Sequence, residues 1–361
     1  MKKNLFFTVF VCACLASCVN ESETLLKESK GQRLTFGAPV MYNQSRHVGE
    51  IAPDAGYPED ESFTVFGIEH EGTFTAWEAT NVIKDAQGND FFPEEGEVVT
   101  KSQTENYWYT AKDYYLPTEP NRYLSFAAYS PSTAKDNGTI SYGADGLTIT
   151  DWRMPDTGMY DLMYSTRTTD VKTDVVDIAF LHALSSIHIK FAMAEEEGPH
   201  SVVVTKVAIK STDIKNVGTF NDNITTKTDG TGAEWTGLGA TDDIPAEYAI
   251  LNSEYTVTTT AAEPTASVDF LPIPQTVSDN MKLVISYKIN MKEGEDYQVV
   301  ENLEIPFKHF KIGATTDVTE NWARATRYFY TVTFGGLTKI KFNPSVTDWD
   351  DVDDAGTYII K

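Results

Sequence analysis

Residues 33–41 read RLTFGAPVM, and the interpretation of the whole chain starts from this stretch. Its apolar side chains recur at every second position: Leu34, Phe36, Ala38 and Val40. Alternation with a period of two predicts a β-strand with one buried face. Polar sequence lies on both sides of the stretch. We therefore expect a separate first strand that packs against sequence further along the chain.

A leader sequence precedes this strand. Two lysines are followed by an apolar run from Leu5 to Ser17, which is shorter than the roughly 20 residues that span a bilayer. The run ends in Leu15-Ala16-Ser17-Cys18, which resembles a bacterial lipobox. We predict a lipoprotein signal peptide at residues 1–17, with Cys18 as the lipid-bearing first residue of the mature chain. The alternative is an ordinary cleaved signal followed by an incidental cysteine.

Two polar segments flank the predicted strand. Residues 19–30 form a charged tether, and residues 42–62 are rich in Pro, Gly, Asp and Glu, which predicts an exposed loop. Arg46 lies in this loop, and exposed loops are where proteases cut. Composition by itself favours a solvated loop arginine at this position.

Composition excludes several classes of site. The other two cysteines, Cys12 and Cys14, lie in the leader, so the mature chain has no thiol for disulfides, zinc thiolates or thiol catalysis beyond Cys18. The formal charge of −24 argues against electrostatic binding of nucleic acid or of anionic lipid surfaces. Association with other proteins must then rest on something other than charge.

The remaining sequence predicts an all-β fold. Short alternating segments are separated by turn signals, as in residues 63–68, 123–129, 201–210 and 328–334. We find no long amphipathic helix and no repeat of 20–50 residues in the sequence, which favours β-sandwiches. The polar stretch TRTTDVKTD at residues 166–174 predicts a link between two domains.

Three groups of residues suggest metal binding, and none carries a full ligand pattern. Residues 84–90 are explained as a hairpin tip. The aspartates in residues 348–354 lack the central glycine and the distal glutamate of an EF-hand. His182 and His188 are expected to be structural. We therefore predict neither a metal nor another cofactor.

Two functional alternatives remain open at this point. The aromatic stretch Tyr107–Tyr115 (YWYTAKDYY) could bind glycans on a surface lipoprotein, although aromatic residues of this kind more often belong to a sandwich core. A surface hydrolase with an unrecognised carboxylate pair is the third hypothesis. Motifs for nucleophilic, nucleotide-dependent or zinc catalysis are absent from the sequence, so we predict that the protein is not an enzyme.

The ordered pieces of the chain resemble the fimbrillin family, the subunits of type V pili on Gram-negative bacteria. The resemblance is carried by the lipobox, the early strand before Arg46, and five further pieces: residues 161–164 (DLMY), 180–187 (FLHALSSI), 271–275 (LPIPQ), 322–330 (WARATRYFY) and 346–349 (VTDW). Each piece is short, and their order along the chain makes the resemblance specific.

This resemblance implies two tandem transthyretin-like β-sandwich domains. It also implies a precursor carried to the outer membrane and cell surface as a lipoprotein, an arginine-specific protease that removes the first strand, and a fimbrium built by strand exchange between fimbrillin subunits. Arg46 matches the cleavage position, because it follows the strand. Arg33 is the rival, but a cut there would leave the strand attached. A host or bacterial surface receptor is a further expected partner, and nucleic acid is not.

The expected organisation follows from these assignments. Residues 1–17 are the expected signal peptide, and residues 18–46 are the tether and removable strand. Residues 47–174 form the N-terminal sandwich, which residues 33–41 complete before cleavage. Residues 175–361 form the C-terminal sandwich, with a possible donor strand at 357–361. The candidate donor residues are Tyr358, Ile359 and Ile360. Because that strand is short, residues from about Lys339 could contribute to it.

The lipid assignment gives a direct test. Replacing Cys18 by alanine removes the only sulfur that the modification could use, so labelling with a fatty-acid probe in cells should be lost. Labelling that persists in Cys18→Ala would refute the lipobox.

Overall fold

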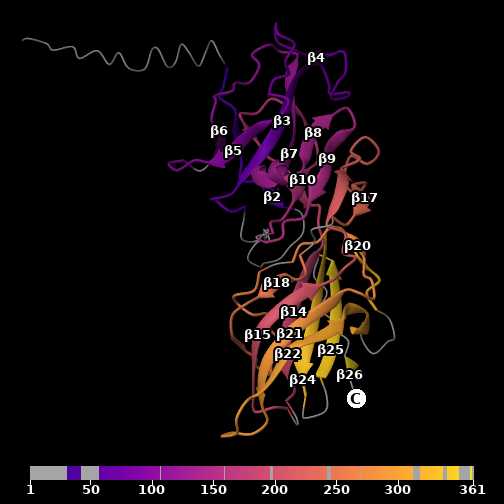
Figure 1. Ribbon diagram of the computed structural model, residues 1–361. Helices are drawn as coiled ribbons and strands as arrows, with labels where there is room; N and C mark the ends of the chain where they lie inside the picture. The colour runs from indigo at the N-terminus through magenta and orange to yellow at the C-terminus, as the bar shows by residue number, and fades with distance from the viewer. Residues whose placement is uncertain are drawn as a thin grey trace, which may run out of the picture.

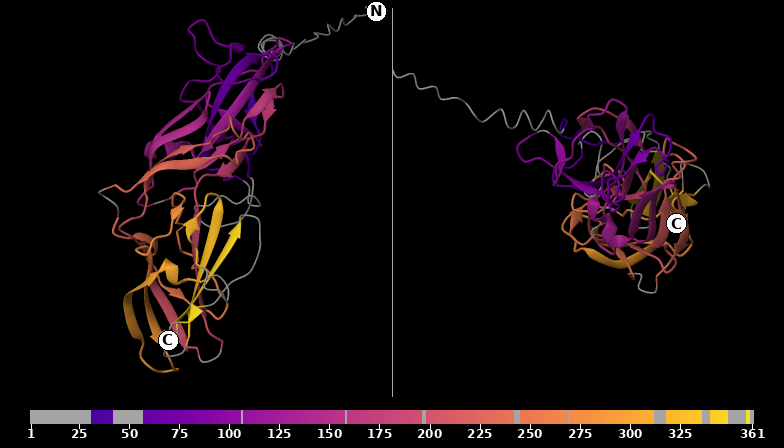
Figure 2. Two further views of the ribbon diagram at one scale, coloured as in Figure 1. Left: turned by 90° about the vertical axis from the view of Figure 1, so that its right-hand side faces the viewer. Right: turned by 90° about the horizontal axis from the view of Figure 1, so that it is seen from above.

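The computed structural model of the 361-residue chain describes ten ranges. They are residues 31–41, 57–105, 107–157, 159–195, 198–241, 245–268, 270–311, 318–335, 340–348 and 358–359. These residues form two β-rich lobes that stack along one long axis (Figures 1 and 2). The helices among them are two 3₁₀ turns, η1 (Ser132–Asn137) and η2 (Phe307–His309). The expected all-β fold class is confirmed.

The first lobe contains two sheets (Figure 1). The larger has the order β12-β1-β6-β5-β3-β7-β10-β13-β2, with β11 beside β7 and β4 beside β3. Its strands are β1 (Thr35–Phe36), β2 (Val40–Met41), β3 (Ser62–Glu71), β4 (Val82–Ile83), β5 (Glu97–Lys101), β6 (Trp108–Thr110), β7 (Arg122–Ser130), β10 (Met163–Ser165), β11 (Thr168–Val171), β12 (Val175–Val176) and β13 (Ala179–His182). The smaller, of order β17-β16-β9-β8, consists of β8 (Thr139–Gly143), β9 (Gly146–Arg153), β16 (Val217–Asn221) and β17 (Glu234–Gly239).

The second lobe contains the remaining strands. One sheet has the order β14-β24-β25-β26 and another β18-β15-β21-β22, with β19 beside β15. Their bounds are β14 (Ser186–Met193), β15 (Ser201–Lys210), β18 (Tyr248–Leu251), β19 (Tyr255–Thr256), β21 (Lys282–Asn290), β22 (Gln298–Pro306), β24 (Thr326–Phe334), β25 (Ile340–Asp348) and β26 (Tyr358–Ile359). A two-stranded ladder joins β20 (Gln275–Thr276) to β23 (Asn321–Trp322).

Strand β3 shows why these sequences form sheets that are covered on both faces. Phe63 and Val65 belong to a core enclosed by the larger sheet, which we call the inner core. Phe66 and Ile68 point the other way, into a core that continues into the second lobe, which we call the shared core. A strand buried on both faces reads as a nearly continuous apolar run, as this one does.

The sequence predicted a domain boundary at residue 174, but several strands after that residue pair with first-lobe strands. Strands β12 and β13 lie beyond that position and still belong to the first-lobe sheet, and β16 pairs with β9. Figure 1 shows β17 beside the first-lobe strands although it follows β15 in the sequence. Residues 166–174 look like a linker because β11 is an irregular edge strand, with Asp170 at a φ of 56°. The chain therefore enters the second lobe after β13 and returns to the first lobe for β16 and β17.

The two lobes meet through a polar junction next to the shared core. The Arg324 guanidinium donates hydrogen bonds to the Tyr164 hydroxyl at 2.8 Å and to the His182 carbonyl at 3.2 Å. The backbone N–H of Ala325 donates to the Leu184 carbonyl at 2.8 Å. These bonds tie the turn before β24 to the first-lobe strands β10 and β13 and to Leu184, which follows β13.

The two histidines expected to be structural each face a carboxylate. His182 Nδ1 lies 2.7 Å from the Asp161 carboxylate, and both side chains are buried. His188 Nδ1 lies 3.0 Å from Glu263, and its Nε2 is hydrogen-bonded to Ser186 at 2.7 Å. Paired polar groups of this kind satisfy one another inside a core. Within the described ranges no cluster of three metal-ligating side chains is present.

A search of the described residues for membrane-spanning helices finds none of sufficient length and apolarity.

The lobe junction predicts a measurable loss of stability. Replacing Arg324 by alanine removes both of its hydrogen bonds. One hydrogen bond to a charged group contributes roughly 1.5–3 kcal/mol, and because Arg324 is only half-buried we expect its two bonds together to contribute about as much. We expect the free energy of unfolding, measured with urea, to fall by about that amount. Arg122→Ala is the matched control, because its ion pair with Glu69 lies at the surface and should contribute about 0–1 kcal/mol. Equal losses of stability in the two variants would contradict a stabilising role for Arg324 at the lobe junction.

Candidate functional site

The segment that contains β1 and β2 belongs to the larger first-lobe sheet: β1 lies between β6 and β12, and β2 pairs with β13 on one side. Phe36 is opposite Trp108 in an antiparallel pair and opposite Val176 in a parallel pair. Further along, Val40 pairs with Ala179. The segment therefore closes the larger sheet around the inner core.

Backbone hydrogen bonds run along both sides of this segment. They join Leu34 N to Tyr114 O (2.8 Å), Leu116 N to Gln32 O (2.9 Å), Thr35 N to Asp174 O (2.8 Å), Gly37 N to Val176 O (3.0 Å) and Val40 N to Ile178 O (2.9 Å). If the segment were withdrawn, the groups on its two neighbours would lose their partners. Each buried polar group left unpaired costs roughly 1–3 kcal/mol.

Two of the four predicted apolar side chains face inward. Leu34 and Phe36 are buried, and the Phe36 ring packs edge to face against Phe63 (centroids 6.1 Å apart) and Phe126 (5.9 Å). The expected alternation fails beyond them, where Ala38 is exposed and Val40 is 52% exposed.

Pro39 explains the change of face. Proline has no N–H for the ladder, and the structure has a gap between β1 and β2 at this point. The Pro39 side chain is the buried one there, so the inward positions shift by one residue. At Gly37 an added Cβ would lie 2.5 Å from the Asp177 carboxylate, which leaves little room for a larger residue.

Tyr57 is a functional candidate that the sequence patterns did not reveal. It is the first described residue after Met41, and it is buried against Trp108 (centroids 5.1 Å), Phe63 (5.7 Å) and Phe180 (6.0 Å). Its hydroxyl is hydrogen-bonded to Ser130 at 2.7 Å, and burial raises its pKa above the usual range. Tyr57 thus fills part of the inner core and follows Arg46 in the sequence.

The other predicted site residues are placed as follows. Cys18, Arg46 and Ile360 lie outside the described residues. Tyr358 and Ile359 form β26, which pairs with Phe342 and Lys341 of β25 at the edge of a second-lobe sheet. Arg33, the alternative cleavage residue, forms an ion pair with Asp113 at 2.7 Å.

The aromatic stretch 107–115 is partly core. Trp108 and Tyr114 are buried, whereas Tyr107 and Tyr109 are half-buried and meet edge to face with centroids 6.4 Å apart. Burial and then a hydrogen bond to Glu97 raise the pKa of Tyr114. Tyr107 and Tyr109, which remain partly at the surface, are therefore not coplanar.

One group of side chains has the residue types of a hydrolytic triad. His70 Nε2 is 2.9 Å from the Ser125 hydroxyl and 3.8 Å from Asp170, and its Nδ1 is 2.9 Å from the Gly72 carbonyl. His70 and Ser125 are 1% and 0% exposed. These contacts join β3 to β7 inside the sheet, where a substrate has no access to the serine.

Comparisons with known proteins agree with this architecture. The family model described as fimbrillin-like matches residues 52–349. The chain resembles the structure of a fimbrial protein from Bacteroides vulgatus, with 16% identity, a TM-score of 0.58, and coverage of 88% of this chain and 99% of that one.

Two further structures share less of the fold geometry. A candidate cell adhesion protein from Bacteroides uniformis has 16% identity, a TM-score of 0.47, and coverage of 88% and 97% of the two chains. A fimbrial assembly protein from Parabacteroides distasonis has 11% identity, a TM-score of 0.33, and coverage of 83% and 91%. None of the curated protein sequences matches this chain.

The inner core predicts how strongly the segment is held. Phe36→Ala removes a ring that is 1% exposed, and such changes cost about 3–5 kcal/mol in free energy of unfolding. Val40→Ala is the matched control, because its exposed side chain should matter by less than about 0.5 kcal/mol. Chemical denaturation of both variants measures the difference, and a near-neutral Phe36→Ala would show that the segment does not hold the core.

Proposed function

Because this chain belongs to the fimbrillin-like family, we propose that it is a pilus subunit whose first strand is removed and then replaced by a strand from a neighbouring subunit. Its place is the cell surface, and its role is adhesion through a fimbrium. The removable strand is residues 34–41, and the neighbour's C-terminal region supplies the replacement.

One observation carries the proposal. Residues 34–36 lie between two neighbours in the sheet, β6 and β12, with Phe36 in the inner core, and Val40–Met41 continue the pairing on one side, with β13. The segment consists of two strands of two residues each, and after the proposed processing at Cys18 it would lie near the N-terminus. A strand near the end of a chain can be removed without breaking the chain anywhere within the rest of the sheet.

The position of Arg46 fits removal by an arginine-specific protease. It lies between Met41, the last residue of β2, and Tyr57, which packs in the inner core. A cut at Arg46 frees the strand and keeps Tyr57 in the subunit. A cut at Arg33 would free only residues up to that point and would leave β1 and β2 attached.

The replacement follows the physics of β-augmentation. A groove with unpaired N–H and C=O groups and apolar pockets binds an extended strand, which restores the hydrogen bonds and fills the pockets. Head-to-tail repetition of such a heterologous contact gives an open filament. Tyr358, Ile359 and Ile360 remain the proposed donor residues, and β26 is paired with β25 over only two residues.

Lipidation at Cys18 would hold the precursor at the outer membrane before the cut. The tether of residues 19–30 separates that anchor from the first described residue of the sandwich, Gly31. The same cut at Arg46 that frees the strand would release the subunit from its lipid. A single cut would then both release the subunit from the membrane and open its groove for a neighbour's strand.

Limited proteolysis of the purified mature precursor tests the proposal. An arginine-specific protease should cut after Arg46, and the cut protein should form multimers in native electrophoresis as residues 31–41 are lost. Arg46→Ala should stay monomeric under the same treatment. Arg33→Ala is the control and should assemble like the unaltered chain. Mass spectrometry identifies the cut and shows whether the strand has left.

The outcome that opposes the proposal is specific. If the cut chain loses residues 31–41 and nevertheless remains monomeric at high concentration, the vacated groove is not an acceptor for another subunit. If Arg46→Ala assembles as readily as the unaltered chain, cleavage at Arg46 is not the trigger.

A further inference from the structure

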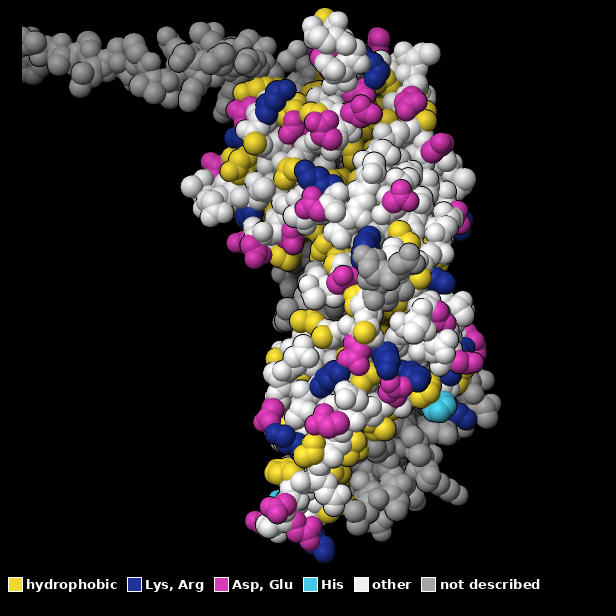
Figure 3. All heavy atoms as spheres, viewed as in Figure 1, with side chains coloured by type: hydrophobic (Ala, Val, Ile, Leu, Met, Phe, Trp, Pro, Cys, Tyr) yellow, Lys and Arg dark blue, Asp and Glu magenta, His cyan; other side chains and the backbone are white. Residues whose placement is uncertain are grey.

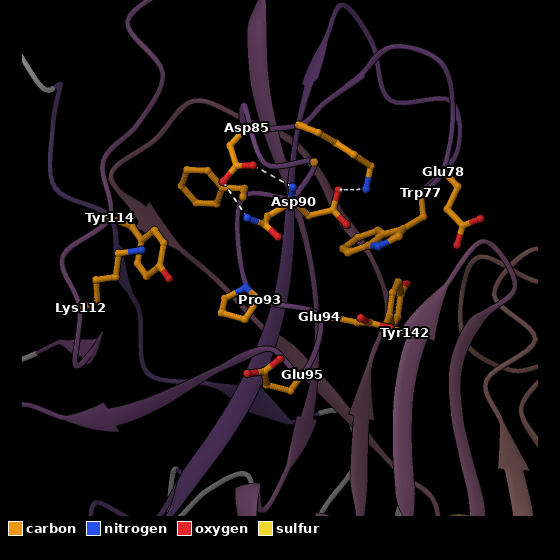
Figure 4. Close-up of a pocket in the computed structure, with 14 residues that line it drawn as sticks. Trp77, Glu78, Asp85, Asp90, Pro93, Glu94, Glu95, Lys112, Tyr114 and Tyr142 are labelled. Atoms are coloured by element: carbon orange, nitrogen blue, oxygen red, sulfur yellow. Dashed lines mark hydrogen bonds and ion pairs between the residues drawn. The ribbon is translucent and has the colours of Figure 1, made fainter.

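A cavity of about 640 Å³ lies on the first lobe, outside the strand-exchange site (Figure 4). Its walls come from the loop between β4 and β5, the segment after β6, the turn before β4, and β8. This volume is in the range of small-molecule and cofactor sites. The strand segment 31–41 contributes no residue to its lining.

Aromatic rings stand on both sides of the cavity. On one side the Trp77 and Tyr142 rings meet edge to face with centroids 4.4 Å apart, and on the other Phe91 packs on Tyr114 with centroids 5.4 Å apart. Trp77 and Tyr114 are buried, so the half-buried Phe91 and Tyr142 are the rings more open to a ligand. Figure 4 shows Trp77 and Tyr142 facing Tyr114 across the opening. The Arg167 guanidinium donates a hydrogen bond to the Tyr142 hydroxyl at 2.7 Å, which fixes that ring in place.

The upper rim carries polar groups that are already oriented. Asp85 accepts hydrogen bonds from the backbone N–H and the side-chain amide of Asn89, both at 2.9 Å. Asp90 pairs with Lys84 at 2.8 Å. Groups held in this way lose little conformational entropy when a ligand binds, and carboxylates accept hydrogen bonds from ligand hydroxyls.

We propose that this cavity binds an uncharged oligosaccharide. The C–H faces of a sugar ring pack on aromatic rings, and its hydroxyls suit the carboxylate, amide and ammonium groups at the rim. The charge of the lining selects against acidic sugars, because five carboxylates and two lysines surround the opening. A sialylated or sulfated glycan would meet net repulsion there.

The proposal concerns adhesion and does not depend on strand exchange. It would give the uncut precursor and the assembled subunit the same ligand. The cavity includes Lys112 and Tyr114 of the aromatic stretch 107–115 and takes its other three rings, Trp77, Phe91 and Tyr142, from elsewhere in the chain.

A glycan array probed with the full mature chain tests it, followed by calorimetric titration of the best neutral oligosaccharide. We expect neutral glycans to be bound and their sialylated forms to bind about tenfold more weakly. Phe91→Ala and Asp90→Ala should each weaken binding by about tenfold or more. Tyr297→Ala and Asp60→Ala are the matched controls, because both are exposed and lie outside the cavity.

Several results would overturn the proposal. They are the absence of any retained glycan, equal binding of sialylated glycans, and neutral-glycan binding that neither cavity variant alters. Phe91 is half-buried, so thermal melting checks that its variant is folded. If Phe91→Ala does not fold, Asp90→Ala still decides, because Asp90 contributes only a surface ion pair to the fold.

Discussion

Backbone pairing along residues 34–41 is the constraint on which the first lobe depends. The same two chain segments, 35–41 and 175–180, run parallel to each other and join the two ends of the larger sheet. A closed sheet has no free edge to pair with a stray chain. The closure also encloses the inner core, so opening it would expose both an unpaired ladder and a row of aromatic rings. Everything proposed for assembly follows from this one position in the sheet.

The acidity of the chain makes that ladder more important for association. With a formal charge of −24, two copies repel one another at long range. On the face seen in Figure 3, Asp and Glu side chains are spread over both lobes with Lys and Arg among them. In the proposed assembly, a shared β-ladder with apolar pockets would give a contact between copies that is strong at short range without charge complementarity.

Local patterns in the sequence predicted some features and missed others for identifiable reasons. The alternation of Leu34 and Phe36 was sufficient to predict a strand with a buried face, because period-two burial is a local property. The return of β16 and β17 to the first lobe was not predictable, since their Gly- and Thr-rich sequence resembles a loop and their partner is β9. Likewise, nothing near His182 in the sequence indicates that Asp161 will be its partner, and Tyr57 has no pattern around it that separates it from the loop.

The division of the inner core between two parts of the chain explains how a strand could leave without unfolding the lobe. Phe36 and Tyr57 both pack on Phe63, one from the N-terminal segment and one from beyond the loop. Loss of the segment removes Leu34 and Phe36, whereas Tyr57 keeps its contacts with Trp108 and Phe180 and its hydrogen bond to Ser130. In the proposed exchange, the vacated part would be a groove that Tyr57, Trp108 and Phe180 still line. A groove of that kind favours replacement by another strand over collapse, because collapse would have to bury the unpaired N–H and C=O groups of both neighbours.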